Sequence, residues 1–209
     1  MPDKKNSGKI ITNDPRVAYF DRCAEGWDSD VQKVRRTLGR LEQCRELLGF
    51  RGGQDVLEVG CGTGQITGWL AGQVAPGRVV GIDFSAQMLA RAQAKSLPAE
   101  FRLLDICSAP AGEAAFDVAF CFHCFPHFRD QPAALANLAA SLRPGGRLIV
   151  MHLAGSQQVN AMHSGFGGAV GQDHLPATER WPSLLGGAGF ELIGLIDRED
   201  LFLLRARRT

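Results

Sequence analysis

The chain lacks any long apolar run. None of its 209 residues falls in an uninterrupted apolar window of the roughly eighteen residues that a membrane helix needs. Residues 1–9 are polar and lysine-bearing and lack the apolar centre of a signal peptide. We therefore expect no membrane partner and a cytoplasmic location.

The chain also lacks an excess of either charge. Its 23 basic and 22 acidic residues give a formal net charge of +1, so no overall attraction to nucleic acid is expected. Arg205, Arg207 and Arg208 make a basic end that we interpret as a solvated strand end. The six cysteines are scattered and no export signal accompanies them, so we expect reduced thiols rather than a disulfide framework.

What the chain does have is a glycine-rich motif between two apolar runs. The run 56–59 leads into Gly60-Cys61-Gly62-Thr63-Gly64, and Asp83 ends a second apolar run nineteen residues later (83 − 64). The order indicates a strand, a glycine turn, a helix, a strand and an acid. Glycine lets the backbone approach a ligand closely, and the following helix points unpaired N–H groups at the same place. An aspartate at the tip of the second strand suits a ribose diol, so the motif predicts an adenosine-containing cofactor.

The spacing of the glycines narrows the choice of cofactor. A dinucleotide fingerprint is G-x-G-x-x-G, whereas this turn is G-x-G-x-G and follows Glu58 in the strand. A buried acid at that point would repel a pyrophosphate but would suit a sulfonium or an ammonium group. A nicotinamide-dependent oxidoreductase is therefore the less favoured alternative.

Strands and helices alternate from residue 55 onward, which predicts a mostly parallel sheet. We expect a disordered tail over 1–13, an N-terminal helical cap over 14–50, and an α/β domain over 51–209 with a loop insertion at 154–178 that covers the acceptor. The expected strands are 55–60, 78–83, 100–104, 116–122, 146–152, 190–197 and 201–207, the last two forming a hairpin. The expected helices of the α/β domain are 64–73, 86–96, 132–142 and a short one at 179–188.

The run Leu57 to Gly64 resembles motif I of class I S-adenosylmethionine-dependent methyltransferases. Further similarity lies at 81–85, 104–106, 116–118 and 142–146. The resemblance implies an α/β, doubly wound, mostly parallel seven-stranded sheet with helices on both faces and the last strand antiparallel. It implies S-adenosyl-L-methionine as cofactor and S-adenosyl-L-homocysteine as product. The residues that would hold the cofactor are Glu58, Gly60, Cys61, Gly62, Gly64, Asp83, Phe84, Met88, Asp105, Ile106 and Phe122.

All five histidines lie in the second half of the chain. His123 and His127 follow the fourth strand, His152 ends the fifth, and His163 and His174 lie in the polar stretch. Histidine titrates near neutral pH and ligates metals, so the five are interpreted as separate polar residues, as a source of a general base, or as a metal site. We predict that His123, His152 and His163 line one pocket and are catalytic, with His174 also reaching inward, and we leave the metal open.

The segment after the fourth strand also bears on the acceptor. Related enzymes that methylate amino groups of bases or protein amides often carry Asn/Asp-Pro-Pro-Tyr/Phe there, whereas this chain has residues 123–127, His-Cys-Phe-Pro-His. The difference favours a small-molecule acceptor with an oxygen, sulfur or nitrogen nucleophile. The alternative is a protein of the same fold that binds the cofactor without turnover. Alternation along a strand would place Cys121 and Cys124 on opposite faces, so we interpret them as core thiols.

Overall fold

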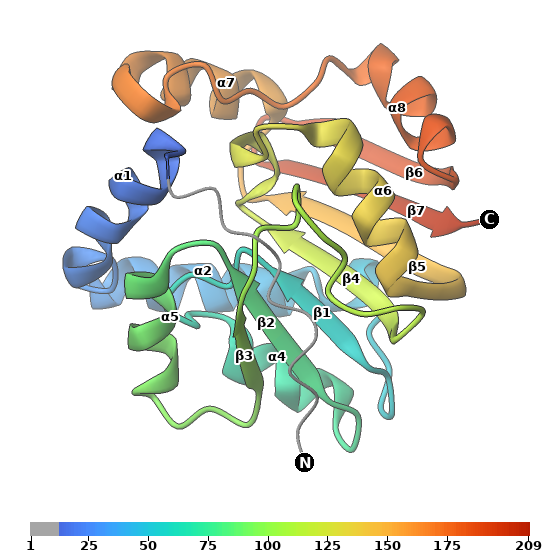
Figure 1. Cartoon of the computed structure of the whole chain (residues 1–209), viewed down its shortest axis with the longest axis horizontal. Helices are drawn as coiled ribbons and strands as arrows, with labels where there is room; N and C mark the ends of the chain where they lie inside the picture. The colour runs from blue at the N-terminus through green and yellow to red at the C-terminus, as the bar shows by residue number, and fades with distance from the viewer. Residues whose placement is uncertain (1–12) are drawn as a thin grey trace.

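A seven-stranded sheet forms the centre of the molecule (Figure 1). The computed structural model describes residues 13–209, and the strand order is β3-β2-β1-β4-β5-β7-β6. The first five strands are parallel, and β7 is antiparallel to both β5 and β6. The predicted fold class is confirmed, including the antiparallel last strand.

The strands lie close to their predicted positions. They are β1 (Val56–Val59), β2 (Val79–Asp83), β3 (Glu100–Leu103), β4 (Phe116–Phe122), β5 (Leu142–His152), β6 (Phe190–Arg198) and β7 (Leu201–Arg208). The side-chain alternation of a strand divides β4 between two cores, since Ala119 and Cys121 face one cluster and Val118 and Phe120 face the other. Parallel strands that are buried on both faces in this way need helices on both sides of the sheet.

Helices cover the two faces as that burial requires. The α-helices are α1 (Pro15–Cys23), α2 (Val31–Gln43), α3 (Arg45–Leu48), α4 (Thr67–Val74), α5 (Ala86–Gln93), α6 (Gln131–Ser141), α7 (Ser156–Phe166) and α8 (Trp181–Gly187), and the 3-10 turns are η1 (Ala24–Gly26), η2 (Phe125–His127), η3 (Gly168–Val170) and η4 (Thr178–Arg180). The apolar faces of α6 and α8 join one core, and those of α2, α3 and α4 join the other. No helix within residues 13–209 is long and apolar enough to cross a bilayer.

The stretch 154–178 differs from the loop that we expected. It contains the eleven-residue helix α7, whose first turn is fixed by Asp197, a residue of β6 that accepts a hydrogen bond from the Ser156 backbone N–H at 2.9 Å. Val159 packs this helix into the core. The sequence did not predict this helix, because the segment is polar and rich in glycine and the residue that caps the helix belongs to another element.

Two smaller expectations are also corrected. The expected strand 146–152 begins earlier than predicted, because the chain already pairs as β5 from Leu142, across a register shift between Phe116 and Val118. Cys124 lies beyond the end of β4, where the alternation no longer applies, and it joins Cys121 in the same core cluster instead of the opposite face. All six cysteines lie within the described residues and are free thiols.

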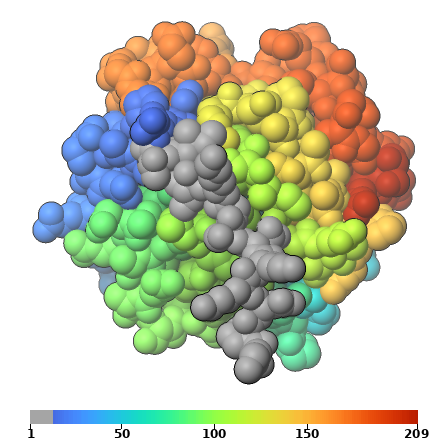
Figure 2. All heavy atoms as spheres, in the orientation of Figure 1, coloured from blue at the N-terminus to red at the C-terminus, as the bar shows by residue number. Residues whose placement is uncertain are grey.

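The predicted N-terminal cap is only partly separate from the sheet. Leu41 of α2 and Leu48 of α3 belong to a core cluster of the α/β unit. Helix α1 instead lies along α5 and contacts η3 beyond α7, and Figure 2 shows the blue α1 segment beside the orange α7 region. The predicted tail, 1–13, falls outside the described residues except for residue 13.

Candidate active site

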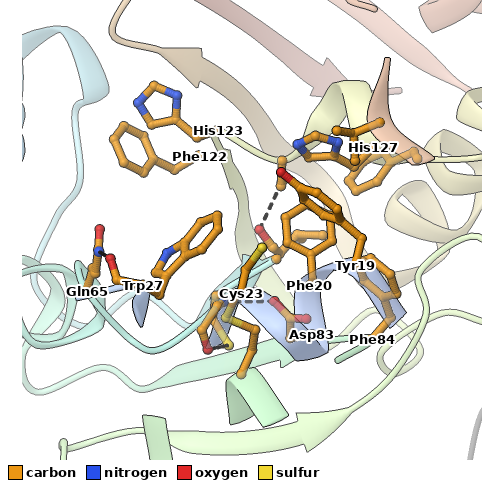
Figure 3. A pocket seen from close by; sticks show the side chains of 18 of the residues that line it. Tyr19, Phe20, Cys23, Trp27, Gln65, Asp83, Phe84, Phe122, His123 and His127 are labelled. Atoms are coloured by element: carbon orange, nitrogen blue, oxygen red, sulfur yellow. Dashed lines mark hydrogen bonds between the residues drawn. The ribbon is translucent and has the colours of Figure 1, made fainter. Parts of the chain in front are cut away.

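One cavity of about 800 Å³ lies at the carboxyl ends of the parallel strands, beneath α1. This is a typical volume for a small-ligand site, and open α/β sheets generally bind ligands at this edge. Figure 3 shows Asp83 and Phe84 on one side of it and Phe122, His123 and His127 on the other, with Phe20 between them. The cavity is lined by thirteen of the predicted site residues, which are Glu58, Gly60, Cys61, Gly62, Asp83, Phe84, Met88, Asp105, Ile106, Phe122, His123, His152 and His163.

The glycine turn after β1 forms the floor of the cavity. Gly60 has φ +64°, and a Cβ there would lie 2.5 Å from the Cβ of Cys124, so the turn needs glycine on both counts. Gly62 has φ +55°, and its nearest neighbour would be the indole Nε1 of Trp27 at 3.9 Å. The space over Gly62 is therefore open to a ligand.

Gly64 is the one predicted cofactor residue that does not line the cavity. A Cβ there would lie 2.8 Å from the Cδ1 of Leu97 and 3.3 Å from the Cβ of Ala92. The third glycine of the motif thus permits the turn to pack on α5 and on the segment that follows it, and its role is close packing rather than ligand contact.

Glu58 is buried at the end of β1 and has a single side-chain partner among the described residues. Its Oε2 accepts a hydrogen bond from the Thr67 hydroxyl at 2.6 Å. Burial raises the pKa of Glu58 to about 8; the Thr67 hydrogen bond acts downward and Asp83 adds a smaller upward effect. A cationic group placed beside Glu58 would favour the ionised form, as the ammonium of an amino-acid moiety would.

Asp83 ends β2 and is buried beside the glycine turn. Its Oδ2 accepts from the backbone N–H of Gly62 at 2.8 Å, and its Oδ1 accepts from that of Ser85 at 2.8 Å. Burial raises the pKa of Asp83 to about 6, against the effect of these N–H donors. Each oxygen retains acceptor capacity for a hydroxyl, so the geometry suits a ribose diol.

Asp105 lies beyond β3 in a hydrogen-bond network that the sequence did not reveal. Its side chain accepts from the Cys107 N–H at 2.8 Å and the Ser108 hydroxyl at 3.0 Å, and it pairs with Arg129. The Ile106 carbonyl accepts from an Asn137 amide N–H at 2.8 Å. Asp105 is therefore held rigidly at the edge of the cavity. Arg129 helps to position the Asp105 side chain, and no sequence pattern predicted this role.

The segment 15–28 closes over the side of the cavity formed by the glycine turn and Asp83 through two carboxylates. Asp21 accepts from the Ser85 hydroxyl at 2.6 Å, and Asp28 accepts from Thr63 at 2.9 Å and from Lys95 at 2.7 Å. These bonds connect the cap directly to the turn after β1 and the turn after β2.

Aromatic rings fill the middle of the cavity. The Phe20 ring contacts Phe84 edge-on at 5.7 Å between centroids, Trp27 at 5.9 Å, and His127 at 4.9 Å. Phe20 thus lies at the boundary between the acidic side of the cavity and the side that carries the histidines.

Four histidines line the second half of the cavity in two pairs. The rings of His123 and His152 are 5.1 Å apart, and those of His127 and His163 are 4.9 Å apart. His174 does not join them, contrary to our expectation, because its Nε2 lies 2.9 Å from the Ser164 hydroxyl and it lines a separate small cavity beside α6.

The predicted catalytic histidines are held in their neutral forms. Burial lowers the pKa of His123 to about 4, assisted by Lys33 and Arg40. Burial likewise lowers the pKa of His152 and of His163. The Nε2 of His152 is buried without a protein partner among the described residues, so it is a polar group that can contact a ligand.

The histidines do not form a metal cage. Within residues 13–209 no three His, Cys, Asp or Glu side chains converge in a way that would hold a metal ion. The geometry gives the metal hypothesis no support.

Asp173 was missed by the sequence interpretation. Its buried carboxylate lies 2.8 Å from Nδ1 of His127 and accepts from Nε of Arg16 at 2.9 Å. One signal was available, because Asp173 is the only acidic residue between 154 and 178. Its partners, however, lie 157 and 46 residues away in the sequence.

Comparisons with known proteins agree with this geometry. A family model described as a methyltransferase domain matches residues 56–146. The methyltransferase GfsG of Streptomyces halstedii is 31% identical over 196 residues, which cover 87% of this chain and 70% of that protein. The chain belongs to the class I S-adenosylmethionine-dependent methyltransferases.

Further similar proteins include longer relatives and a solved structure of the same fold. The O-methyltransferase cnsE of Penicillium expansum is 34% identical over 161 residues, covering 71% of this chain and 56% of that protein. The chain spans 41% and 35% of two further relatives, so it corresponds to part of their length. A methyltransferase structure from Aquifex aeolicus superposes with a TM-score of 0.68 at 19% identity, over 86% of this chain and 99% of that one, and supports the fold.

Proposed function

We propose that this chain transfers the methyl group of S-adenosylmethionine to a hydroxyl of a small, largely apolar molecule. The observation that carries the proposal is the division of one cavity into an acidic half and a half lined by aromatic, aliphatic and neutral histidine side chains. The cofactor supplies an activated methyl group on a sulfonium. The chain supplies binding, alignment and a place for the acceptor proton.

The acidic half fits the cofactor. Glu58 lies where it can pair with an ammonium group, Asp83 offers two oxygens for ribose hydroxyls, and Gly62 leaves room above the turn. Phe84 and Met88 line the same half and would contact the faces of the adenine ring. We propose these contacts together with Asp105 and Ile106 at the adenine edge.

The other half favours a neutral or anionic acceptor. The carboxylates of Asp14 and Asp173 are both paired with Arg16, so neither is available to a cationic amine. Lys33 of α2 lines this half, as do the apolar side chains of Met162, Val170 and others. Among oxygen, sulfur and nitrogen acceptors, this favours a hydroxyl or thiol on an apolar body.

A hydroxyl needs a base, and we propose that a histidine supplies it. Proton removal in the transition state typically contributes about 10²–10⁴-fold, and alignment contributes about 7–11 kcal/mol. His123, His152 and His163 all line the acceptor half, and His152 can also donate or accept a hydrogen bond through its free Nε2.

Two measurements test the proposal. Calorimetry with S-adenosylhomocysteine and with NADH should show binding of the first only. Methyl transfer from labelled S-adenosylmethionine should then be measured on shape-matched phenols, alcohols, thiols and amines. We expect transfer to phenols first. Binding without transfer to any compound would favour the alternative, a protein that holds the cofactor without turnover, whereas preferred transfer to amines would overturn the acceptor assignment.

A further inference from the structure

Asp173 holds two histidines of the acceptor half at once. Its side-chain carboxylate lies 2.8 Å from Nδ1 of His127, and its backbone carbonyl lies 2.5 Å from Nδ1 of His163. Arg16 holds the same carboxylate from α1, with Nε at 2.9 and 3.0 Å from the two oxygens and a terminal nitrogen at 2.5 Å. A single buried residue therefore connects α1, the segment after β4, and the end of α7.

These contacts determine where the ring protons lie. A carbonyl can only accept a hydrogen bond. Although burial acts in the other direction, the hydrogen bonds from His127 and Arg16 keep the pKa of Asp173 low, so its carboxylate is an acceptor too. The Nδ1 atoms of His127 and His163 must therefore carry the hydrogens. In the neutral rings, both Nε2 atoms hold a lone pair.

Among the residues that the structure describes, His127 is the one cavity histidine with a carboxylate partner for its protonated form. The Nδ1 of His163 faces a neutral carbonyl, and the Nε2 of His123 already accepts from the Leu153 N–H at 3.4 Å. The His127 ring also touches Phe20, the residue at the boundary with the cofactor half. His127 therefore lies at the boundary between the two halves of the cavity.

We propose that His127 is the general base of the methyl transfer and that Asp173 is its positioning residue; this rests on the proposed function. The acceptor O–H proton passes to Nε2 of His127 while the oxygen forms a bond to the methyl carbon and the carbon–sulfur bond breaks. The products are the methyl ether, S-adenosylhomocysteine and an imidazolium. The positive charge of the sulfonium is replaced by that of the imidazolium, which Asp173 neutralises.

Arg16 makes this arrangement depend on the cap. The segment that carries Arg16 also carries Asp21 and Asp28, which bind the turns around the cofactor half. When α1 is in place, the cofactor loops and the Asp173–His127 pair are fixed by one element. The position of the Asp173–His127 pair is therefore coupled to that of the turns around the cofactor half.

The test is Asp173→Asn, with the ring nitrogens of His127 read by ¹⁵N NMR. The asparagine amide can donate to Nδ1, which moves the ring hydrogen to Nε2 and removes the base. We expect kcat to fall about 10²-fold or more, the scale of lost general-base catalysis, while the dissociation constant for S-adenosylhomocysteine changes less than about threefold. Glu179→Gln, an exposed change near the start of α8, is the matched control and should leave kcat unchanged.

His127→Asn provides a second variant, since its amide can still donate to Asp173 but cannot take the proton. It should lose kcat to the same extent and retain the fold. A wild-type His127 with its hydrogen on Nε2, or a kcat of Asp173→Asn within about threefold of wild type, overturns the assignment. These results can be told apart from failure of the proposed function. The NMR measurement of the His127 ring needs no acceptor, and it can be made even if S-adenosylhomocysteine does not bind.

Discussion

The two halves of the cavity are built in different ways. The cofactor half comes mainly from the ends of β1 and β2 and the turns after them, within residues 58–88, with Asp105 and Ile106 at its edge. Much of its polar bonding joins side chains to nearby backbone. The acceptor half brings together α1, the segment after β4, the end of β5 and α7. The first half therefore depends on short-range geometry, whereas the second depends on contacts between distant segments.

The halves also differ in how burial acts on their titratable groups. In the cofactor half, burial raises the pKa of Glu58 to about 8 and that of Asp83 to about 6. In the acceptor half, burial lowers the pKa of His123 to about 4. Near pH 7, Glu58 therefore holds its proton, Asp83 is mostly ionised and His123 is neutral.

The largest expected effect is on the cofactor half alone. Gly62→Val should weaken S-adenosylhomocysteine binding by more than about 10³-fold, because branched carbons would fill the open space over the turn. Gly53→Val is the control for the backbone strain of a non-glycine residue at positive φ. Gly53 has φ +87°, and no atom lies within 4 Å of the added Cβ. Calorimetry on both folded variants checks this, and equal losses would show that strain rather than occupancy is responsible.

Asp83→Ala should weaken cofactor binding by about 1.5–3 kcal/mol, or roughly 10–150-fold, the scale of hydrogen bonds to a charged group. Asp55→Ala is a suitable control, since Asp55 is a carboxylate before β1 that pairs with Arg143 and does not line the cavity. An unchanged dissociation constant for Asp83→Ala would refute the ribose assignment.

The pH dependence of stability should distinguish the halves by sign. Glu58 holds its proton more tightly when folded than when unfolded, so its contribution is full below about pH 4.5 and is lost as pH rises toward 8. His123 behaves oppositely, since its lowered pKa makes stability fall as pH drops from about 6.5 toward 4.

Urea unfolding at pH 5, 6.5 and 8 measures these slopes. The free energy of unfolding should decrease between pH 5 and 8, and Glu58→Gln should remove on the order of 2 kcal/mol of that decrease. His123→Gln should reduce the decrease in the free energy of unfolding below pH 6.5. If Glu58→Gln leaves the alkaline slope unchanged, Glu58 is not the group that holds the proton.

The smallest expected effect is on the acceptor half. His152→Gln should reduce kcat/KM for the acceptor about two- to tenfold, the scale of one neutral hydrogen bond, and leave S-adenosylhomocysteine affinity within about twofold. Steady-state kinetics and calorimetry on the same preparation give both values. A larger loss in cofactor affinity than in kcat/KM would show that the two halves are not independent at this position.

The same contrast explains what the sequence could predict. The strands, the helices between them and the residues around Gly62 and Asp83 were predictable because strand alternation and turn chemistry are local. Helix α7 was not, because its start depends on Asp197 of β6. Asp173 and Arg16 form one ion pair across 157 residues, and no local pattern connects them.

The position of Trp27 has a practical consequence. Of the three tryptophans, Trp181 is fully buried in the core and Trp69 packs on Phe50, whereas Trp27 lines the cavity and is 41% exposed. Its indole lies over the glycine turn, where an adenosine derivative would change its surroundings. Intrinsic fluorescence, followed in a stopped-flow instrument, should therefore record the arrival of the cofactor and the settling of the cap without any added label.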